Sequence, residues 1–166
     1  MTPSPWILRH LDAVAPGRAI DVAAGSGRHA FAMADLGFSV TAVDRNPDLA
    51  SLYQESEVQF LCADLEGQRW PLADHAYDLV LVSNYLYRPH FAELFQLVAS
   101  GGYLLYETFG EGNEVYGKPS NPDFLLRAGE LASALDASFD IIDERFEDVS
   151  SPSPAVRAGV FALRIR

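Results

Sequence analysis

The stretch AIDVAAGSGRHAFAMADLG, residues 19–37, decides the fold of this chain. Its first six residues, 19–24, are apolar except for one acid, which predicts a short buried strand. Gly25 and Gly27 follow, and apolar side chains then recur at helical spacing until Gly37 ends the pattern. A strand that turns through glycines into a helix brings backbone N–H groups against a ligand. The letters also fit the G-x-G-x-x-A pattern of dinucleotide sites, so this stretch leaves the ligand open.

Strand and helix patterns alternate along the rest of the chain. With the opening stretch included, strands are predicted at residues 19–24, 39–43, 57–63, 76–84, 103–108, 139–149 and 155–166. Helices are predicted at residues 28–36, 90–98 and 124–135, and another begins at Asn46 and Pro47, where the asparagine can cap it. This alternation predicts an α/β fold with a parallel sheet covered by helices on both faces. Only a short proline–serine turn separates the last two strands, so we expect an antiparallel hairpin there.

Composition and charge narrow the classes of partner. The 166 residues include 23 acidic and 12 basic side chains, a net charge of −11, which disfavours nucleic acid and anionic membranes. No apolar run approaches the roughly 18 residues of a membrane span. Because charged residues interrupt the N-terminal apolar positions, we expect no signal peptide and a cytoplasmic protein. The single cysteine, Cys62, excludes an internal disulfide, and its apolar neighbours predict that it is buried.

The carboxyl ends of the predicted strands are the places to look for a ligand, because open parallel sheets bind ligands there. Asp44 directly follows the strand at 39–43 and lies 19 residues after Gly25. A carboxylate at that spacing can accept hydrogen bonds from both hydroxyls of an adenosine ribose. The alternative is a solvated acid or a cap for the helix that begins at Asn46. The agreement of strand end, spacing and glycine turn favours the ribose role.

Two further acids refine the ligand. Asp64 follows the strand at 57–63, where it can meet the edge of an adenine, the alternative being an ordinary loop acid. Asp21 lies four residues before Gly25 and would repel a pyrophosphate. It suits the ammonium group of an amino acid, or it orients the turn by accepting N–H groups. Together the three acids predict a ligand in which adenosine is joined to an amino-acid tail without phosphates. S-adenosylmethionine has this structure.

Three segments carry a resemblance to a known family: AIDVAAGSGRHAFAMADLGFSVTAVDRNPD, CADLEGQRWPLADHAYDLVLVSNYLYRP and LVASGGYLLYETF. They resemble class I S-adenosylmethionine-dependent methyltransferases, above all the small bacterial enzymes of the tellurite-resistance and thiopurine type. The resemblance covers roughly residues 19–135. It implies a Rossmann-like, seven-stranded, mostly parallel sheet with helices on both faces and a C-terminal antiparallel hairpin. We therefore expect one methyltransferase domain over residues 1–166, with a short N-terminal segment at 1–17, a cofactor-binding core at 18–135 and a closing hairpin at 136–166.

The resemblance also implies which residues bind the cofactor. It places Asp21 and the two glycines around the methionine part, Asp44 at the ribose and Asp64 at the adenine. Asn84 follows a strand at the point where family members place residues near the methyl group. The full set expected to bind S-adenosylmethionine is Asp21, Ala23, Gly25, Gly27, Asp44, Arg45, Asp64, Leu65 and Asn84. Ala23 stands where the family usually has glycine, but it is small enough for the turn to close.

Candidate catalytic residues come from two loops. They are Asn84, Tyr87, Arg88 and Tyr116. The first three belong to the stretch SNYLYRP, residues 83–89, in which we expect Arg88 to clamp an anionic acceptor and the tyrosines to line an apolar pocket. Tyr116 lies in a long glycine-rich loop, where it is expected to flank the acceptor as part of a lid with Glu107 and Asn113.

Two weaker motifs are set aside. Residues 112–118 begin like a phosphate-binding loop, but Pro119 replaces the Ser or Thr that would bind Mg²⁺. The four histidines show no zinc-ligand spacing, so no metal is expected. His29 is expected to face solvent or to cap the first long helix.

Three functions follow from these patterns. The leading one is an S-adenosylmethionine-dependent methyltransferase that acts on a small-molecule acceptor, with a general base needed only if the acceptor must lose a proton. The second is an NAD-dependent oxidoreductase that uses the glycine turn and Asp44, which Asp21 disfavours. The third is a non-catalytic module of methyltransferase fold that binds the cofactor or a partner. The expected partner is a small-molecule acceptor, with no nucleic acid and no membrane, and a homodimer stays open.

Overall fold

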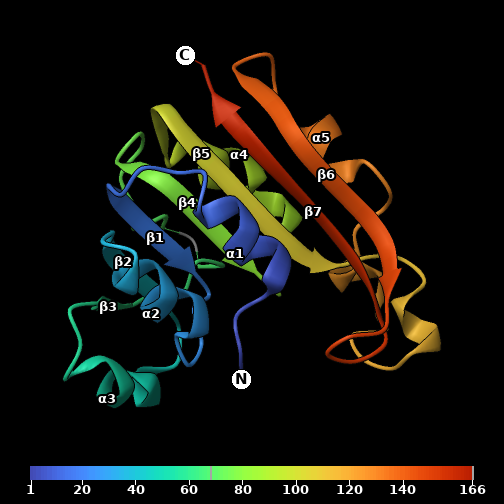
Figure 1. Ribbon diagram of the computed structural model, residues 1–166, viewed down its shortest axis with the longest axis horizontal. Helices are drawn as coiled ribbons and strands as arrows, with labels where there is room; N and C mark the ends of the chain where they lie inside the picture. Colours follow the sequence, from blue (N-terminus) through green and yellow to red (C-terminus); the bar gives the residue numbers. More distant parts are fainter. Residues whose placement is uncertain (68, 166) are drawn as a thin grey trace.

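Within residues 1–67 and 69–165, which the computed structural model describes, seven strands form one sheet (Figure 1). The strands are β1 Arg18–Val22, β2 Ser39–Asp44, β3 Gln59–Cys62, β4 Tyr77–Ser83, β5 Val98–Phe109, β6 Phe139–Val149 and β7 Ala155–Arg164. Their order across the sheet is β3-β2-β1-β4-β5-β7-β6. The first five strands run parallel, and β7 pairs antiparallel with both β5 and β6. The predicted fold class, including the closing hairpin, is confirmed.

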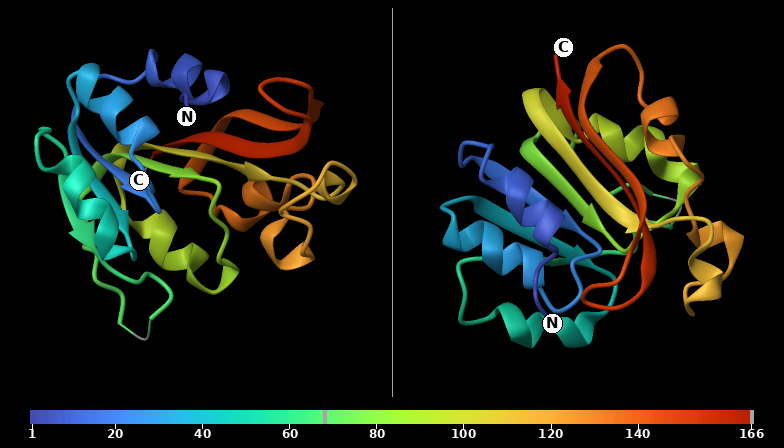
Figure 2. Two further views of the ribbon diagram at one scale, coloured as in Figure 1. Left: turned by 90° about the horizontal axis from the view of Figure 1, so that it is seen from below. Right: turned by 45° about the vertical axis from the view of Figure 1, so that its right-hand side comes forward.

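Helices cover both faces of the sheet, which gives the three layers seen edge-on in Figure 2. They are α1 Pro5–Leu11, α2 Arg28–Asp35, α3 Ala50–Tyr53, α4 Phe91–Gln96 and α5 Glu130–Ala134. Short 3₁₀ turns add η1 Pro47–Leu49, η2 Arg88–His90, η3 Asn113–Val115 and η4 Pro122–Phe124. The helices α1 and α2 pack on one face through Ile7 and Met33, and α4 and α5 pack on the other through Leu94 and Leu131.

The central strands explain why a ligand crevice forms where it does. In β4 every residue except Asp78 is buried, as expected for a parallel strand that is covered on both faces. The strand β1 lies between β2 and β4, so the chain leaves β1 in one direction and returns to β4 on its other side. The carboxyl ends of β1 and β4 therefore mark the switch point at which open α/β sheets bind ligands.

The helix predicted at residues 124–135 is much shorter in the structure, where α5 spans only Glu130–Ala134. The preceding residues instead run alongside the end of β5. Leu126 N–H donates to the carbonyl of Phe109 at 3.0 Å, and Glu111 N–H donates to the carbonyl of Leu126 at 2.8 Å. This pairing buries Leu125 and Leu126 in extended backbone. A long-range contact with β5 thus outweighs the local helical pattern.

The N-terminal segment forms α1, which the sequence patterns did not predict. Ser4 caps this helix, because its Oγ accepts the N–H of Ile7 at 3.4 Å. Trp6, Ile7 and Leu11 are buried against the sheet. Among the described residues, none of the helices has the length and apolar character needed to span a bilayer.

The prediction that Cys62 is buried is wrong. Cys62 ends β3, which is an edge strand of the sheet, and its side chain is exposed. An edge strand has a neighbour on one side only, so an apolar run in it need not be covered.

Candidate active site

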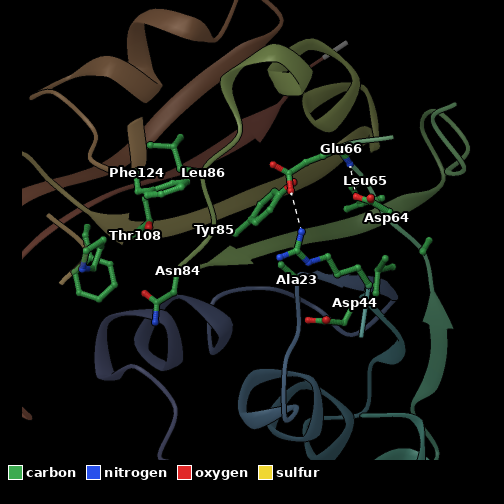
Figure 3. Close-up of a pocket in the computed structure, with 15 residues that line it drawn as sticks. Ala23, Asp44, Asp64, Leu65, Glu66, Asn84, Tyr85, Leu86, Thr108 and Phe124 are labelled. Carbon is green, nitrogen blue, oxygen red and sulfur yellow. Dashed lines mark hydrogen bonds and ion pairs between the residues drawn. The ribbon is translucent and has the colours of Figure 1, made fainter. Parts of the chain in front are cut away.

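A cavity of about 530 Å³ lies beyond the carboxyl ends of the parallel strands (Figure 3). The residues that line it at the five strand ends include Ala23, Asp44, Asp64, Asn84 and Thr108. The cavity therefore occupies the switch point between β1 and β4. Its volume falls within the range of about 300–1,000 Å³ that is typical of small-molecule sites.

The glycine turn after β1 is held in one shape by two hydrogen bonds. Gly25 has a φ of +57°, and a Cβ at this position would meet no atom of residues 1–67 or 69–165 within 4 Å, so the turn faces open space. Its N–H donates to Asp44 Oδ2 at 2.9 Å, and its carbonyl accepts the hydroxyl of Tyr53 at 2.7 Å. Tyr53 is buried between the rings of Phe31 and Phe60. The turn is thus preorganised to present its backbone to a ligand.

Replacing Tyr53 with Phe is expected to weaken the binding of a ligand at the glycine turn about fivefold. The ring stacking is kept, but the carbonyl of Gly25 loses its donor, a change worth about 1 kcal/mol. Isothermal titration calorimetry with S-adenosylhomocysteine, the demethylated form of the ligand expected from the sequence, measures the effect. Tyr103→Phe is the matched control, because Tyr103 stacks on Phe161 away from the cavity. Equal affinities for the two variants would contradict this role of Tyr53.

Asp21 lies beneath the turn and does not line the cavity. It is buried, with 1% of its surface exposed, and its Oδ1 has no hydrogen-bond partner among the residues that the structure describes. Burial raises the pKa of its carboxyl from 3.8 to about 7, although a backbone hydrogen bond from Ala30 and the charge of Arg28 oppose the shift. Ala30 belongs to the first turn of α2, whose N–H groups lack partners within the helix. Of the two roles expected for Asp21, this geometry favours orienting the turn.

The raised pKa of Asp21 makes the stability of the protein depend on pH. The folded state holds this proton more tightly than the unfolded state, so the contribution to stability is complete below pH 3.8 and is lost as the pH rises toward 7. Asp21→Asn cannot ionise and avoids that loss. Relative to the native chain, the variant should gain at least about 1 kcal/mol of unfolding free energy between pH 5.5 and pH 8, because one pKa unit corresponds to 1.4 kcal/mol.

Urea unfolding at the two pH values measures this gain. Asp35→Asn, which alters an exposed acid at the end of α2, is the control and should show no such gain. Parallel pH profiles for the native chain and Asp21→Asn would contradict the burial of an ionisable carboxyl beneath the turn.

The side of the cavity formed by β2 and β3 is acidic. Asp44 Oδ1 accepts the N–H of Asn46 at 3.0 Å, in addition to the bond from Gly25, so its carboxylate is fixed at the end of β2. Asp64 Oδ1 accepts the N–H of Glu66 at 2.9 Å. The guanidinium of Arg45 lies 3.9 Å from the carboxylate of Glu66. The charges that line this side sum to a net negative value, which favours a cationic ligand.

Asn84 occupies the junction between this acidic side and the remainder of the cavity. It follows β4 in the left-handed conformation, with a φ of +52°, which asparagine tolerates better than most residues. Its N–H donates to the carbonyl of Glu107 at 2.9 Å, so the backbone is fixed while the side chain is exposed. The side chain is one of those that line the cavity (Figure 3).

The structure does not bring the other three catalytic candidates to the cavity. Arg88 is used within the protein, since its guanidinium donates to the carboxylate of Glu130 at 2.5 and 2.9 Å. Tyr87 packs against the ring of His90. The hydroxyl of Tyr116 donates to Asp148 at 2.7 Å, on the exposed side of the loop after β5. The expected anion clamp at Arg88 is therefore replaced by a contact within the protein.

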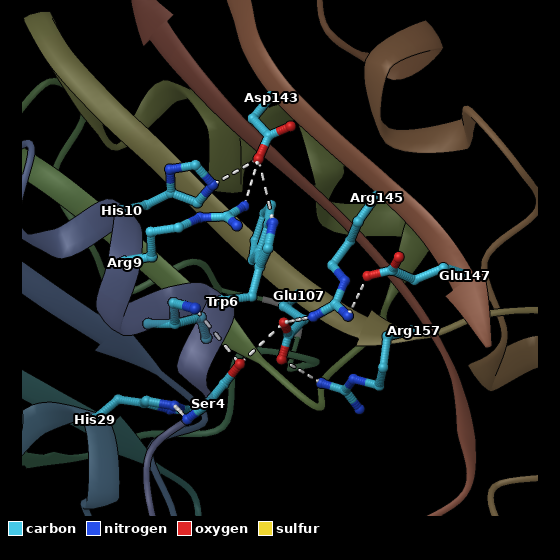
Figure 4. Close-up of polar contacts among 11 residues, drawn as sticks. Ser4, Trp6, Arg9, His10, His29, Glu107, Asp143, Arg145, Glu147 and Arg157 are labelled. Atoms are coloured by element: carbon cyan, nitrogen blue, oxygen red, sulfur yellow. Dashed lines mark hydrogen bonds and ion pairs between the residues drawn. The ribbon is translucent and has the colours of Figure 1, made fainter. Parts of the chain in front are cut away.

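Glu107 also points away from the cavity, into a polar cluster on the face covered by α1 (Figure 4). Arg145 Nη1 and Arg157 Nη2 donate to its two carboxylate oxygens at 2.8 and 2.7 Å, and Ser4 Oγ donates at 3.0 Å. Burial alone would raise the pKa of Glu107, but the two arginines and Ser4 outweigh it and hold the pKa below 4.5. The expected lid role is wrong for Glu107, because strand β5 alternates its side chains between faces.

Two further expectations fail because contacts with residues distant in sequence determine where the side chains lie. His29 is buried, its Nε2 accepts the N–H of Ser4 at 2.9 Å, and burial lowers its pKa to about 4. It neither faces solvent nor caps α2. Asn113 is buried as well, and its side chain binds the carbonyl of Pro119 and the N–H of Val156. It supports the loop after β5 from within.

Several residues of the cavity were not singled out from the sequence. They include Glu66, Leu86, Thr108, Phe109 and Phe124, whereas Tyr85 belongs to the tyrosines expected to line a pocket and does line the cavity. The rule of strand ends did select the two stretches after β4 and β5, but not which residue in each stretch faces the cavity. For Thr108 the sequence offered no sufficient signal, because alternation along β5 places Thr108 and Glu107 on opposite faces without indicating which of the two faces the cavity.

Comparison with known proteins decides the family. A family model described as a methyltransferase domain matches residues 19–102, just over half of the chain. The chain belongs to the methyltransferase family. Its cofactor is S-adenosylmethionine, which decides between the two cofactors that the glycine turn left open. A search among curated proteins gave no match for this methyltransferase.

Solved structures agree with the fold of this methyltransferase. TehB from Haemophilus influenzae superposes with a TM-score of 0.79 at 15% identity, covering 98% of this chain and 62% of TehB, so the chain spans less than two thirds of that protein. A SAM-dependent methyltransferase from Methanosarcina mazei gives 0.71 at 16% identity and covers 99% of both chains. The cyclase SpnF gives 0.71 at 17% identity, covering 96% of this chain and 78% of SpnF. At these identities the likeness concerns the fold alone.

The residues of the cavity fit S-adenosylmethionine. Open space above Gly25 leaves room for a chain against the backbone, and the acidic side suits a ligand with a sulfonium and an ammonium group. Two of the three predicted acids, Asp44 and Asp64, line the cavity. The third, Asp21, is buried outside the cavity and accepts the N–H of Ala30 in α2.

Proposed function

We propose that this methyltransferase transfers a methyl group from S-adenosylmethionine to a small-molecule acceptor by in-line displacement. The observation that carries the proposal is a single cavity of about 530 Å³ that joins the acidic ends of β2 and β3 to the ends of β4 and β5. One cavity that accommodates both molecules holds the reacting atoms together. Positioning of this kind can supply about 7–11 kcal/mol of the barrier to a displacement reaction.

The proposed roles of the cofactor-binding residues follow from their positions. Asp44 accepts hydrogen bonds from the ribose hydroxyls, and its fixed carboxylate needs no rearrangement to do so. Asp64 and the backbone of Leu65 face the adenine. The backbone of Ala23 and Gly25 contacts the methionine part at the open side of the turn. The negative charge of these acids stabilises the positive cofactor.

Methyl transfer at this site requires little acid–base chemistry from the protein. When bound, S-adenosylmethionine would supply an electrophilic methyl group: a lone pair of the acceptor would form a bond to the methyl carbon, and the electron pair of the broken carbon–sulfur bond would remain on sulfur. A proton carried by the acceptor atom leaves to water. The role proposed for Asn84, at the junction of the cavity, is to orient the acceptor through its exposed amide. The remaining walls keep the acceptor in line with the methyl group.

Binding and turnover experiments test the two parts of this proposal. Titration calorimetry with S-adenosylhomocysteine and with NAD should show binding of the first and not of the second. Mass spectrometry should then detect methylated products, with formation of S-adenosylhomocysteine, in a panel of small molecules incubated with S-adenosylmethionine. Binding without turnover of any acceptor would favour a non-catalytic module or another reaction. The structurally similar SpnF, a cyclase, illustrates a different reaction on this fold.

A further inference from the structure

The lining of the cavity changes character from one side to the other (Figure 3). The charged residues among its described lining all end or follow β2 or β3, and they are Asp44, Arg45, Asp64 and Glu66. The side formed by the ends of β4 and β5 and by the loop after β5 is called the acceptor half, and consists of Asn84, Leu86, Thr108, Phe109, Pro119 and Phe124. Among the lining residues that the structure describes, none in the acceptor half carries a charge.

Tyr85 lies between the two halves and is not a base. Burial raises the pKa of its phenol above the ordinary value, and the nearby carboxylates of Glu66 and Asp64 raise it further. The hydroxyl therefore stays protonated at neutral pH. Its backbone is fixed from the opposite side, because the hydroxyl of Tyr106 donates to the carbonyl of Tyr85 at 2.6 Å. An acceptor here meets a hydrogen-bond donor and apolar walls, without a counter-charge.

Phe124 closes the acceptor half from the loop after β5. It ends the η4 turn, and half of its surface (52%) is exposed, although it lines the cavity. Two carbonyls beside it bind Arg88: Nη1 donates to Asp123 at 3.1 Å and Nη2 to Leu125 at 2.7 Å. Glu130 completes the arrangement, since it binds the same guanidinium and accepts the N–H of Arg127 at 3.0 Å. Arg88 thus holds the residues on either side of Phe124 by hydrogen bonds, and its salt bridge with Glu130 fixes the guanidinium outside the cavity.

We propose that the acceptor is an uncharged, largely apolar small molecule, and that Phe124, held in place by Arg88 and Glu130, determines its selection. The proposal rests on the methyltransferase function proposed above. An ion in the acceptor half would lose its hydration without gaining a partner, which strongly disfavours binding. Arg88 is then a positioning residue that acts through Phe124.

Three naphthyl compounds of equal size test the charge preference. They are 2-naphthylmethanol, 2-naphthoate and 2-naphthylmethylammonium, titrated into protein saturated with S-adenosylhomocysteine. The alcohol should bind at least about tenfold more tightly than either ion, as expected when a charge cannot be paired. Equal or tighter binding of either ion, or no binding of the alcohol, would overturn the proposal. Failure of S-adenosylhomocysteine itself to bind would instead count against the proposed function.

Variants of the loop test the role of Phe124. Phe124→Ala should weaken the alcohol about tenfold, the effect of removing apolar contact from a binding pocket, and should leave the affinity for S-adenosylhomocysteine within twofold. Val115→Ala is the matched control, because Val115 is an exposed apolar residue of the same loop that does not line the cavity. A similar loss in both variants would remove Phe124 from the proposal.

A double-mutant cycle tests whether Arg88 acts through Phe124. Arg88→Met should weaken the alcohol nearly as much as Phe124→Ala, and the double variant should be no weaker than Phe124→Ala alone. Arg88→Lys should recover part of the affinity. If the double variant instead loses affinity for the alcohol by the product of the two single losses, Arg88 does not act through Phe124 and its positioning role is overturned. If Arg88→Met does not fold, Glu130→Gln removes the other side of the same salt bridge and serves the same cycle.

Discussion

Asp44→Ala is expected to weaken the binding of S-adenosylhomocysteine about 100-fold. The carboxylate is fixed by N–H groups of Gly25 and Asn46 at 2.9 and 3.0 Å, and it faces the cavity. Hydrogen bonds to a charged acceptor are worth about 1.5–3 kcal/mol each, so the loss of two bonds to the ribose gives at least about 3 kcal/mol. The variant also removes the acceptor for the N–H of Gly25, which loosens the glycine turn. Titration calorimetry measures the change.

The neighbouring Asp48 provides the control for this effect. It is an exposed acid in the η1 turn and does not line the cavity, so Asp48→Ala should change the affinity less than twofold. Melting curves show whether the Asp44 variant is folded. Affinity within threefold of the native value in folded Asp44→Ala would contradict the ribose site at the end of β2.

Glu107→Ala is expected to lower the free energy of unfolding by about 3–5 kcal/mol. The native carboxylate is 1% exposed and lies between Arg145 and Arg157. Removing it leaves the largely buried Arg157 without its counter-charge and Arg145 with only the exposed Glu147, and an unpaired buried charge is the usual cause of losses of this size. For a chain of this length the melting temperature should fall by roughly 10 °C. Urea unfolding and differential scanning calorimetry measure the two quantities.

Glu147 is the matched control, because it binds the same Arg145 at 2.6 Å from an exposed position. Its replacement by Ala should cost less than about 1 kcal/mol, as expected for a surface ion pair. The lowered pKa of Glu107 adds a test by pH. Its contribution is present above the unfolded value of 4.5 and is lost as the pH falls through the lower folded value, so Glu107→Ala should flatten the acid limb of the stability profile. Equal losses for the two glutamates would contradict the buried pair.

The residues of the cavity show how far sequence patterns reach into a site. Strand ends and glycine spacing were enough to predict Asp44 and Asp64 at the cavity, because both depend on the local passage from a strand into a loop. Patterns left two roles open for Asp21 and could not decide whether its carboxylate faces the ligand or is buried outside the cavity. Its direction depends on the packing of α2 over β1, which is a contact between separate elements.

Arg88 and the segment before α5 show where prediction from sequence ended. The partner of Arg88 is Glu130, 42 residues later, and no spacing rule links the two. Similarly, Leu126 is part of an apolar pattern that suits a helix, yet it pairs with the end of β5. In both cases a partner distant in sequence decides the role of a residue whose local pattern indicates something else.

The sequence by itself determined the order of strands and helices, the closing hairpin and the glycine turn at residues 19–37, because these follow from the period of apolar residues and from turn chemistry within a few positions. Only the tertiary structure decided which side chains share the cavity. The sheet order brings β1 beside β4. The pleat of β5 turns alternate residues to opposite faces, so Thr108 enters the site while Glu107 joins a buried salt bridge on the other side. That choice depends on neighbours brought together by folding, which the pattern of any one segment does not contain.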